Sequence, residues 1–361
     1  MGEILGLGLS HYPNIRGTDD QMANILRGNL QRPDIPESVK DPATWPEPMR
    51  REWGDDEGRS FAPLHRAEFL KHLRVVTQEL EAFKPDFLLI WGDDQYENFH
   101  DDLVPPFCIY AYDDMELRPF APRPGPTGVT PPPSPANVWG LNEDYVLKVP
   151  GKRDAAKYLA RELLGRKIDV AYSYRPLHYE GLSHAFLNAV LYFNYDLAGW
   201  QYPIVPFAVN CYGSRVTVNK GGRFPVGKIE VPEGDLDPPA PSPERCMEVG
   251  AATARALAKS PWRVAIVASS SWSHAFLTPK HYFLHPDMAS DRELYTALKT
   301  GDYATWRKRT VADVEDAGQQ EVLNWWCLAG AMEALGRKPD YCEYVESYVM
   351  NSNKCFAVFK P

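Results

Sequence analysis

Short apolar runs of strand length alternate along this chain with segments whose apolar residues recur at helical spacing. The clearest helical segment is Pro63–Phe83, in which Phe69, Leu73, Val76 and Leu80 share one face. Such alternation favours a parallel or mixed sheet covered by helices. We therefore expect an α/β fold with a central mixed β-sheet flanked by helices. The expected strands are Ile4–Leu9, Phe87–Trp91, Phe107–Tyr112, Val170–Tyr174, Ile204–Val209, Lys228–Val231, Val264–Ala268 and Cys355–Phe359, and the other expected helices are Arg153–Leu164, Pro243–Ala258 and Val311–Leu335.

Three stretches interrupt this pattern without a change in overall composition. Thr18–Ser60 has little periodicity, and Arg118–Pro135 and Pro232–Pro243 are rich in proline. Strand and helix patterns resume on both sides of each, so we interpret them as long loops within one domain that covers residues 1–361.

Composition excludes several classes of function. The net charge of −9, with no basic stripe, argues against a nucleic-acid partner. No window approaches the roughly 18 consecutive apolar residues of a membrane span, and the first residues lack the basic region of a signal peptide. The six cysteines are scattered, with no CxxC pair, as is typical of reduced thiols. We expect a cytoplasmic protein that does not associate with membranes and forms homo-oligomers through its aromatic and proline-rich loops.

Polar residues of the types that bind metal ions or transfer protons follow several expected strands. His11 comes directly after the first strand, and Asp93 and Asp94 follow the second. The carboxyl ends of strands in α/β proteins are where ligands and metals collect, and carboxylates are hard oxygen ligands for divalent cations. The alternative for the paired aspartates is a helix cap followed by a surface turn.

Two further segments place histidines at the same edge. Ser269–Ser273 and His274 follow a strand, and small hydroxyl residues there let the backbone approach a ligand while His274 donates to an anionic oxygen. A buried structural histidine would look the same. His184 begins an apolar helical segment, and an imidazole with an ordinary pKa exchanges protons near neutral pH.

No G-x-S-x-G elbow, Walker loop, H-E-x-x-H or G-x-G-x-x-G is present. These residues instead indicate a metal site that combines histidine and carboxylate ligands from separate strand ends, with a free histidine beside it.

In their order, these motifs resemble the type II (class III) extradiol ring-cleavage dioxygenases, typified by the β subunit of protocatechuate 4,5-dioxygenase. Ser10-His11-Tyr12-Pro13 matches a Ser-His-x-Pro motif whose histidine binds iron. The other matching segments are Leu88–Asp94 for the second ligand's strand, Ser183-His184 followed by Pro203–Pro206 for the catalytic histidine, Ala268–His274 for a serine-rich loop, Asp287–Asp302 for the carboxylate ligand, and Glu321, Asn324, Trp325, Gly330 and Ala331 for a late helix over the site.

The resemblance implies Fe(II) as cofactor and leaves the ligand set open. His11 is one ligand. Family members usually place a histidine where this chain has Asp94, so either Asp94 binds directly or another histidine substitutes, with His65 ahead of His100. The third ligand is expected to be Asp287, with Asp291 and Glu293 as rivals.

The implied reaction is extradiol cleavage of a catechol-like aromatic substrate by O₂. His184 would be the catalytic base, His274 and Ser273 would hold anionic oxygens, and Tyr96 and Trp272 would be walls for the aromatic ring. Two alternatives stay open. One is a zinc- or manganese-dependent hydrolase or lyase, favoured by Asp94; the other is a non-catalytic binding protein of this fold.

Overall fold

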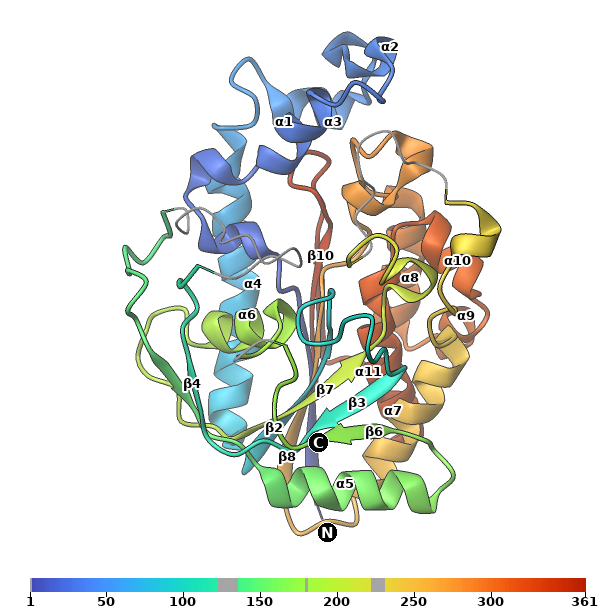
Figure 1. Ribbon diagram of the computed structural model, residues 1–361. Coiled ribbons are helices and arrows are strands. Elements are labelled where there is room, and N and C mark those ends of the chain that lie inside the picture. Colours follow the sequence, from blue (N-terminus) through green and yellow to red (C-terminus); the bar gives the residue numbers. More distant parts are fainter. Residues whose placement is uncertain (1, 123–135, 179–180, 222–230) are drawn as a thin grey trace.

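An eight-stranded mixed sheet forms the centre of the computed structural model, which describes residues 2–122, 136–178, 181–221 and 231–361 (Figure 1). Its strand order is β6-β3-β7-β2-β8-β1-β10-β9, and β7, β2, β8 and β1 run parallel to one another. A separate antiparallel pair, β4-β5, lies outside this sheet. The strands are β1 (Glu3–Leu9), β2 (Phe87–Asp93), β3 (Phe107–Tyr110), β4 (Met115–Leu117), β5 (Leu147–Val149), β6 (Ala171–Ser173), β7 (Ile204–Val209), β8 (Arg263–Ser269), β9 (Tyr341–Val345) and β10 (Lys354–Phe359).

Helices cover both faces of the sheet, and each face has its own apolar core. Along β2, Phe87, Leu89 and Trp91 point into the core beneath α7 and α11, whereas Leu88 and Ile90 point into the core beneath α4 and α6. Figure 1 shows these helix pairs on opposite sides of the strands. The helices are α1 (Asn24–Leu30), α2 (Glu37–Lys40), α3 (Glu47–Trp53), α4 (Phe61–Phe83), α5 (Arg153–Gly165), α6 (His184–Phe193), α7 (Pro243–Leu257), α8 (Met288–Thr300), α9 (Tyr303–Arg307), α10 (Val311–Asp316) and α11 (Leu323–Ala334).

Glycine lets α7 and α11 pack backbone to backbone. A Cβ at Gly250 would lie 1.8 Å from the carbonyl oxygen of Cys327, and one at Gly330 would lie 2.1 Å from that of Met247. Any larger residue at either position would push the helices apart. Their close contact fixes α11 against the sheet and therefore fixes the turn that precedes it.

The predicted α/β class and central mixed sheet are confirmed, and the predicted strands are present wherever the structure describes them. Lys228–Val231 lies almost entirely outside the described residues, as does 123–135 of the proline-rich loop. The single helix Val311–Leu335 is wrong: α10 and α11 are separate because Gly318 between them has a φ of +64°. The insertion Thr18–Ser60 contains the short helices α1, α2 and α3.

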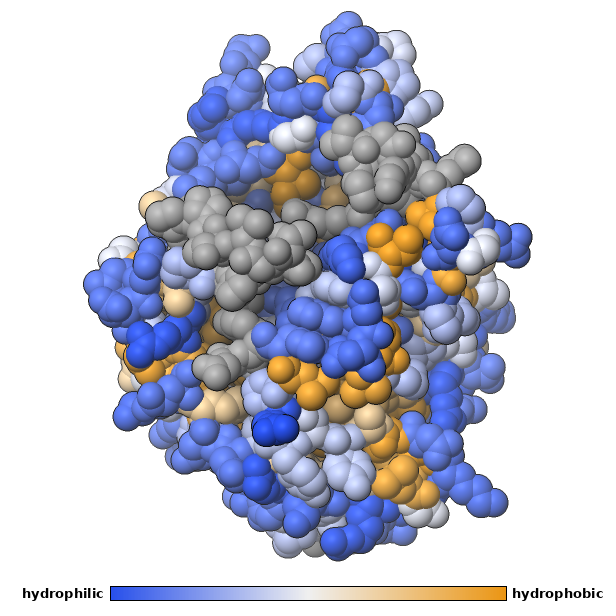
Figure 2. Space-filling model, viewed as in Figure 1, coloured by the Kyte–Doolittle hydropathy of each residue, from blue (hydrophilic) through white to orange (hydrophobic). Residues whose placement is uncertain are grey.

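The surface facing the viewer in Figure 2 is largely hydrophilic, with scattered apolar patches. Within the described part of the chain, no helix combines the length and apolar character needed to cross a bilayer.

Candidate metal centre

Four side chains meet at the edge of the sheet where β1, β2 and β8 end. They are His11, Asp93, His184 and Glu321, and one ligand atom from each lies within 4.8 Å of all the others. His11 follows β1, Asp93 ends β2, His184 begins α6, and Glu321 occupies a 3₁₀ turn before α11. Parallel strands deliver their carboxyl ends to one edge, so residues far apart in sequence are brought together there.

The imidazole of His11 is oriented for metal binding. Its Nδ1–H donates to the carbonyl oxygen of Ser269 at 2.9 Å, which leaves the lone pair on Nε2. That Nε2 is buried, makes no hydrogen bond, and lies 3.2 Å from Glu321 Oε2 and 4.0 Å from Asp93 Oδ1. A metal-binding histidine commonly has this arrangement, with a carbonyl fixing the outer nitrogen.

Asp93 reaches the cluster because of strand alternation. It shares a face of β2 with Leu89 and Trp91, which is the face that α11 covers and from which Glu321 approaches. Its carboxylate is fully buried and neither oxygen has a hydrogen-bond partner. Burial, followed by the nearby charge of Glu321, raises the pKa of Asp93 to about 7.

Glu321 is held through one of its oxygens. The hydroxyl of Tyr212 donates to Oε1, whereas Oε2 has no hydrogen-bond partner and lies 3.3 Å from Nε2 of His274. Burial by itself would raise the pKa of Glu321, but His274 and His11 outweigh it and hold the pKa below its usual range. This carboxylate is therefore charged and faces the imidazoles.

His184 is positioned by Glu97, which lies in the loop after β2. Its backbone N–H donates to both oxygens of Glu97, at 2.9 and 3.0 Å, and its Nδ1 donates to Oε2 at 2.8 Å. Nε2 consequently faces the cluster, 3.8 Å from Asp93 Oδ2. Burial lowers the pKa of His184, but the charges of Glu97 and Asp93 outweigh it and raise the pKa to about 10.

The donor set suits a divalent cation. His11 Nε2, both Asp93 oxygens and Glu321 Oε2 are buried and have no hydrogen-bond partner, although each such atom ordinarily costs about 1–3 kcal/mol. One cation among them would satisfy all of these atoms. A set of imidazole nitrogen and carboxylate oxygen is typical of Fe(II), Mn²⁺ and Zn²⁺ sites.

Comparison with known proteins agrees with this geometry. Residues 218–354 match the family model described as the catalytic LigB subunit of aromatic ring-opening dioxygenase. The chain is related to the class III extradiol dioxygenases. This confirms the family resemblance expected from the strand-end motifs.

The curated relatives include several bacterial enzymes named 2,3-dihydroxyphenylpropionate/2,3-dihydroxicinnamic acid 1,2-dioxygenase. That of Paraburkholderia phymatum is 27% identical over 60% of this chain and 55% of its own length. That of Burkholderia vietnamiensis is 27% identical over 59% and 50%, and that of Cupriavidus necator is 24% identical over 76% and 85%. The match therefore spans about half the length of the first two extradiol relatives.

In the present chain Asp94, the expected second ligand, does not join the cluster. Strand alternation turns it to the opposite side from Asp93, where Oδ1 accepts the backbone N–H groups of Glu97, Asn98 and Phe99 at 3.0–3.2 Å. Asp94 therefore holds a turn, as the alternative expected, but it is buried and no helix for it to cap lies in the described segment between β2 and β3. We therefore replace Asp94 with Asp93 in the candidate ligand set.

The other expected ligands also have different neighbours. Asp287 caps α8, where it accepts from the backbone N–H of Ser290 at 3.1 Å, and it pairs with Lys280 at 2.7 Å. His65 is buried in α4 and packs near Phe61; burial, followed by the charge of Lys354, lowers its pKa well below the usual value. His100 stacks between Tyr96 and His178. None of the three belongs to the four-residue group.

Of the expected catalytic and substrate-binding residues, the two histidines lie at or beside the metal centre, whereas Ser273, Trp272 and Tyr96 have other neighbours. His184 belongs to the four-residue group, and His274 lies beside it, 3.3 Å from Glu321. Burial lowers the pKa of His274 to about 4. The hydroxyl of Ser273 instead donates to the carbonyl of Ala317 and accepts from the N–H of Asp287. Trp272 is fully buried in the core against Trp306 and Trp325, and Tyr96 pairs with Asp101 and Lys220.

Sequence reasoning missed Asp93 and Glu321 as ligands and Glu97 as the partner of His184. A signal for Glu321 existed, because it is a lone carboxylate at the start of the apolar run Val322–Met332. A signal for Asp93 also existed in the alternation of β2. Spacing alone carried no signal for Glu97.

Proposed function

We propose that this protein is an Fe(II)-dependent extradiol dioxygenase that opens a catechol-like ring with O₂. The observation that carries the proposal is the convergence of buried, unbonded ligand atoms from His11, Asp93 and Glu321 on a point that His184 Nε2 also faces. The relationship to the extradiol family supports the reaction class.

Three residues would hold the cation and two histidines would serve the substrate. When bound there, Fe(II) would supply Lewis acidity toward the catechol oxygens and redox chemistry with O₂. His184 takes a phenolic proton at Nε2 while Glu97 fixes the ring through Nδ1. The charges of Asp93 and Glu321 contribute to the raised pKa of His184, and their neutralisation by a bound cation would leave Nε2 available for that proton. His274 provides a second imidazole for the anionic oxygens.

A second candidate is a zinc- or manganese-dependent hydrolase or lyase. The specific observation in its favour is the ligand set, in which Asp93 supplies a carboxylate and Glu321 a second one beside the single imidazole of His11. Oxygen-rich sites favour harder ions. This alternative predicts activity with Zn²⁺ or Mn²⁺ and no consumption of oxygen.

The test is metal content together with oxygen uptake. Protein purified without oxygen, and its His11→Ala variant, are analysed for metal and assayed with 3-(2,3-dihydroxyphenyl)propionate. About one iron per chain, lost in the variant, together with oxygen uptake, supports the dioxygenase. Zinc or manganese without oxygen uptake favours the second candidate. No metal in either protein after reconstitution would remove both and leave a non-catalytic binding protein.

We also propose a cytoplasmic location and a homo-oligomeric state. All six cysteines are free and buried, which is consistent with a reducing compartment. Cell fractionation and sedimentation of the purified protein test the two statements separately; a monomer at micromolar concentration would contradict the second.

A further inference from the structure

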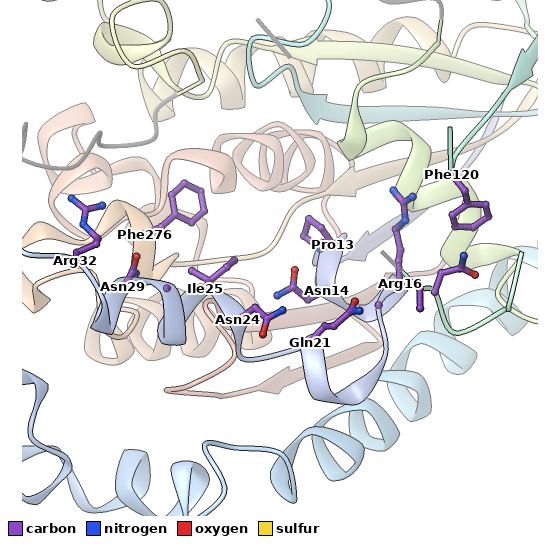
Figure 3. A pocket seen from close by; sticks show the side chains of 14 residues that line it. Pro13, Asn14, Arg16, Gln21, Asn24, Ile25, Asn29, Arg32, Phe120 and Phe276 are labelled. Carbon is purple, nitrogen blue, oxygen red and sulfur yellow. The ribbon is translucent and has the colours of Figure 1, made fainter. Parts of the chain in front are cut away.

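A cavity of about 700 Å³ lies on the segment that follows β1 and on α1 (Figure 3). Five amide side chains line it, those of Asn14, Gln21, Asn24, Asn29 and Asn137. In Figure 3, Arg16 and Phe120 lie at one end of the row, and Arg32 and Phe276 at the other. Six of the 14 lining residues come from the insertion Thr18–Ser60, and four come from the segment between β1 and that insertion.

The cavity adjoins the metal centre on two sides. Pro13, which lines the cavity, is two residues beyond His11. Phe276, which also lines it, packs edge-on against His274 with 5.3 Å between the ring centroids. A ligand that occupies the metal centre therefore has the cavity beside it.

A hydrogen-bonded chain also joins the cavity to the centre. Arg16 Nη1 donates to Oδ1 of Asn188 at 3.1 Å, and Nδ2 of Asn188 donates to the carbonyl oxygen of His11 at 3.1 Å. Asn188 lies one turn after His184 in α6. The guanidinium group of Arg16 is thus connected through Asn188 to the backbone of His11, a candidate metal ligand, and to α6, the helix that begins with the candidate base His184.

The lining chemistry selects a polar, anionic ligand. Amide side chains both donate and accept hydrogen bonds, and arginine recognises carboxylates and similar anions with a planar pair of donors. Although the chain carries a net charge of −9, the described residues that line this cavity include two arginines and neither aspartate nor glutamate. Both arginines have partners: Arg32 pairs with Asp34 at 2.6 Å, and Arg16 donates to Oδ1 of Asn188 at 3.1 Å and to the carbonyl oxygen of Pro119 at 2.5 Å. Arg16 is the candidate for the anion because it is the arginine that is joined through Asn188 to His11.

The size of the cavity sets the length of the ligand. Volumes of about 300–1,000 Å³ are those that enclose drug-sized molecules. At about 700 Å³, the space far exceeds what a short alkyl group needs and accommodates an arm of roughly ten or more non-hydrogen atoms.

We propose that this cavity binds a long side arm of the aromatic substrate, an arm with hydrogen-bonding groups along its length and a carboxylate or similar anion at Arg16. The inference rests on the proposed function, because it takes the ring bound at His11, Asp93 and Glu321 as the anchor of the arm. The substrate class is then a catechol with an extended, polar, anionic substituent.

Two variants address the cavity in different ways. Arg16→Met removes the anion partner. Gly28→Trp fills the space: Gly28 lines the cavity, lies in α1, and has no atom within 4 Å of where a Cβ would be, so the larger residue has room and also favours the helix. The matched controls are Arg50→Met in α3 and Gly165→Trp in α5, where a Cβ also meets nothing within 4 Å.

The first measurement is calorimetric binding of 3-phenylpropionylglycine and its neutral amide to the 361-residue chain. These probes carry the arm without the diol and need no turnover. We expect the acid to bind at least about tenfold more tightly than the amide to the wild-type protein. Arg16→Met should remove that difference, Gly28→Trp should weaken both probes, and the two controls should match the wild type.

The second measurement is oxygen uptake with 3-(2,3-dihydroxyphenyl)propionylglycine and with catechol. We expect Arg16→Met and Gly28→Trp to raise the KM for the conjugate about tenfold more than they raise the KM for catechol. Equal binding of acid and amide, or cavity variants that match the wild type, would overturn the inference even if catechols are cleaved. If no catechol is cleaved but the acid–amide difference is present and lost in Arg16→Met, the proposed function fails and the anion site stands.

Discussion

Asp93 and Asp94 are adjacent, yet the structure predicts opposite effects when each is replaced. Asp93→Asn should abolish metal binding and leave the fold intact, because its carboxylate faces only the candidate centre and makes no hydrogen bond. Asp94→Ala should weaken the fold and retain the metal site, because its carboxylate serves the turn after β2. Asp94→Asn keeps an oxygen acceptor and is the matched control.

The magnitudes follow from the contacts. Asp94 accepts three backbone N–H groups, and leaving each without a partner costs about 1–1.5 kcal/mol, so Asp94→Ala should lower the free energy of unfolding by about 3–4.5 kcal/mol. Burial, followed by the charge of Glu97, raises the pKa of Asp94 to about 7, so an uncharged acceptor is tolerated and Asp94→Asn should stay within about 1 kcal/mol of the wild type. Asp93→Asn removes a buried charge close to Glu321 and should not destabilise the metal-free protein.

The assay combines denaturant unfolding of the metal-free proteins with equilibrium dialysis against Fe(II) without oxygen. We expect the metal affinity of Asp93→Asn to fall at least about a hundredfold, since loss even of a residue that supports a ligand costs about 10–100-fold. Metal retained by Asp93→Asn and lost by Asp94→Asn would refute the assignment from strand alternation.

Three other predictions test separate parts of the protein. His184→Gln should retain the metal and lower kcat for ring cleavage about 10²–10⁴-fold, measured by oxygen uptake; wild-type kcat would remove His184 from the mechanism. Burial raises the pKa of Asp291 to about 7, so the Asp291 carboxyl loses its proton at a lower pH in the unfolded chain than in the folded one, and the free energy of unfolding falls as pH rises from about 4 to 7. Asp291→Asn should reduce that fall by up to about 4 kcal/mol, measured by denaturant unfolding at a series of pH values. An unchanged pH dependence would contradict the raised pKa of Asp291. Gly318→Ala would place a Cβ 2.4 Å from Thr278 Oγ1 at a φ of +64° and should cost about 1–3 kcal/mol in denaturant unfolding, more than the control Gly336→Ala at φ +67° in open space; equal losses would show that crowding at Gly318 is unimportant.

Periodic elements were predictable from the sequence because burial imposes the pattern that the prediction used. α4 repeats apolar residues at helical spacing, and β2, β7 and β8 are buried on both faces and so appear as continuous apolar runs. The strands that were missed have weaker patterns: β4 and β5 are three residues long, and β9 lies at the edge of the sheet with three half-exposed residues. Their pairing depends on partners distant in sequence.

The ligands were harder to predict because each depends on a local geometric choice that composition does not reveal. At the end of β2 the choice is between two aspartates, and the alternation that buries Leu89 and Trp91 beneath α11 carries Asp93 to the same side. Before α11 the choice depends on Gly318, whose positive φ ends one helix so that Glu321 turns inward before the next begins. The backbone carbonyl of Gly318 also accepts the N–H of His274 at 2.8 Å. One break in a predicted helix thus positions a candidate ligand and the histidine beside it. Because the apolar pattern runs through Val311–Leu335 without showing this break, it did not identify Glu321 as a ligand.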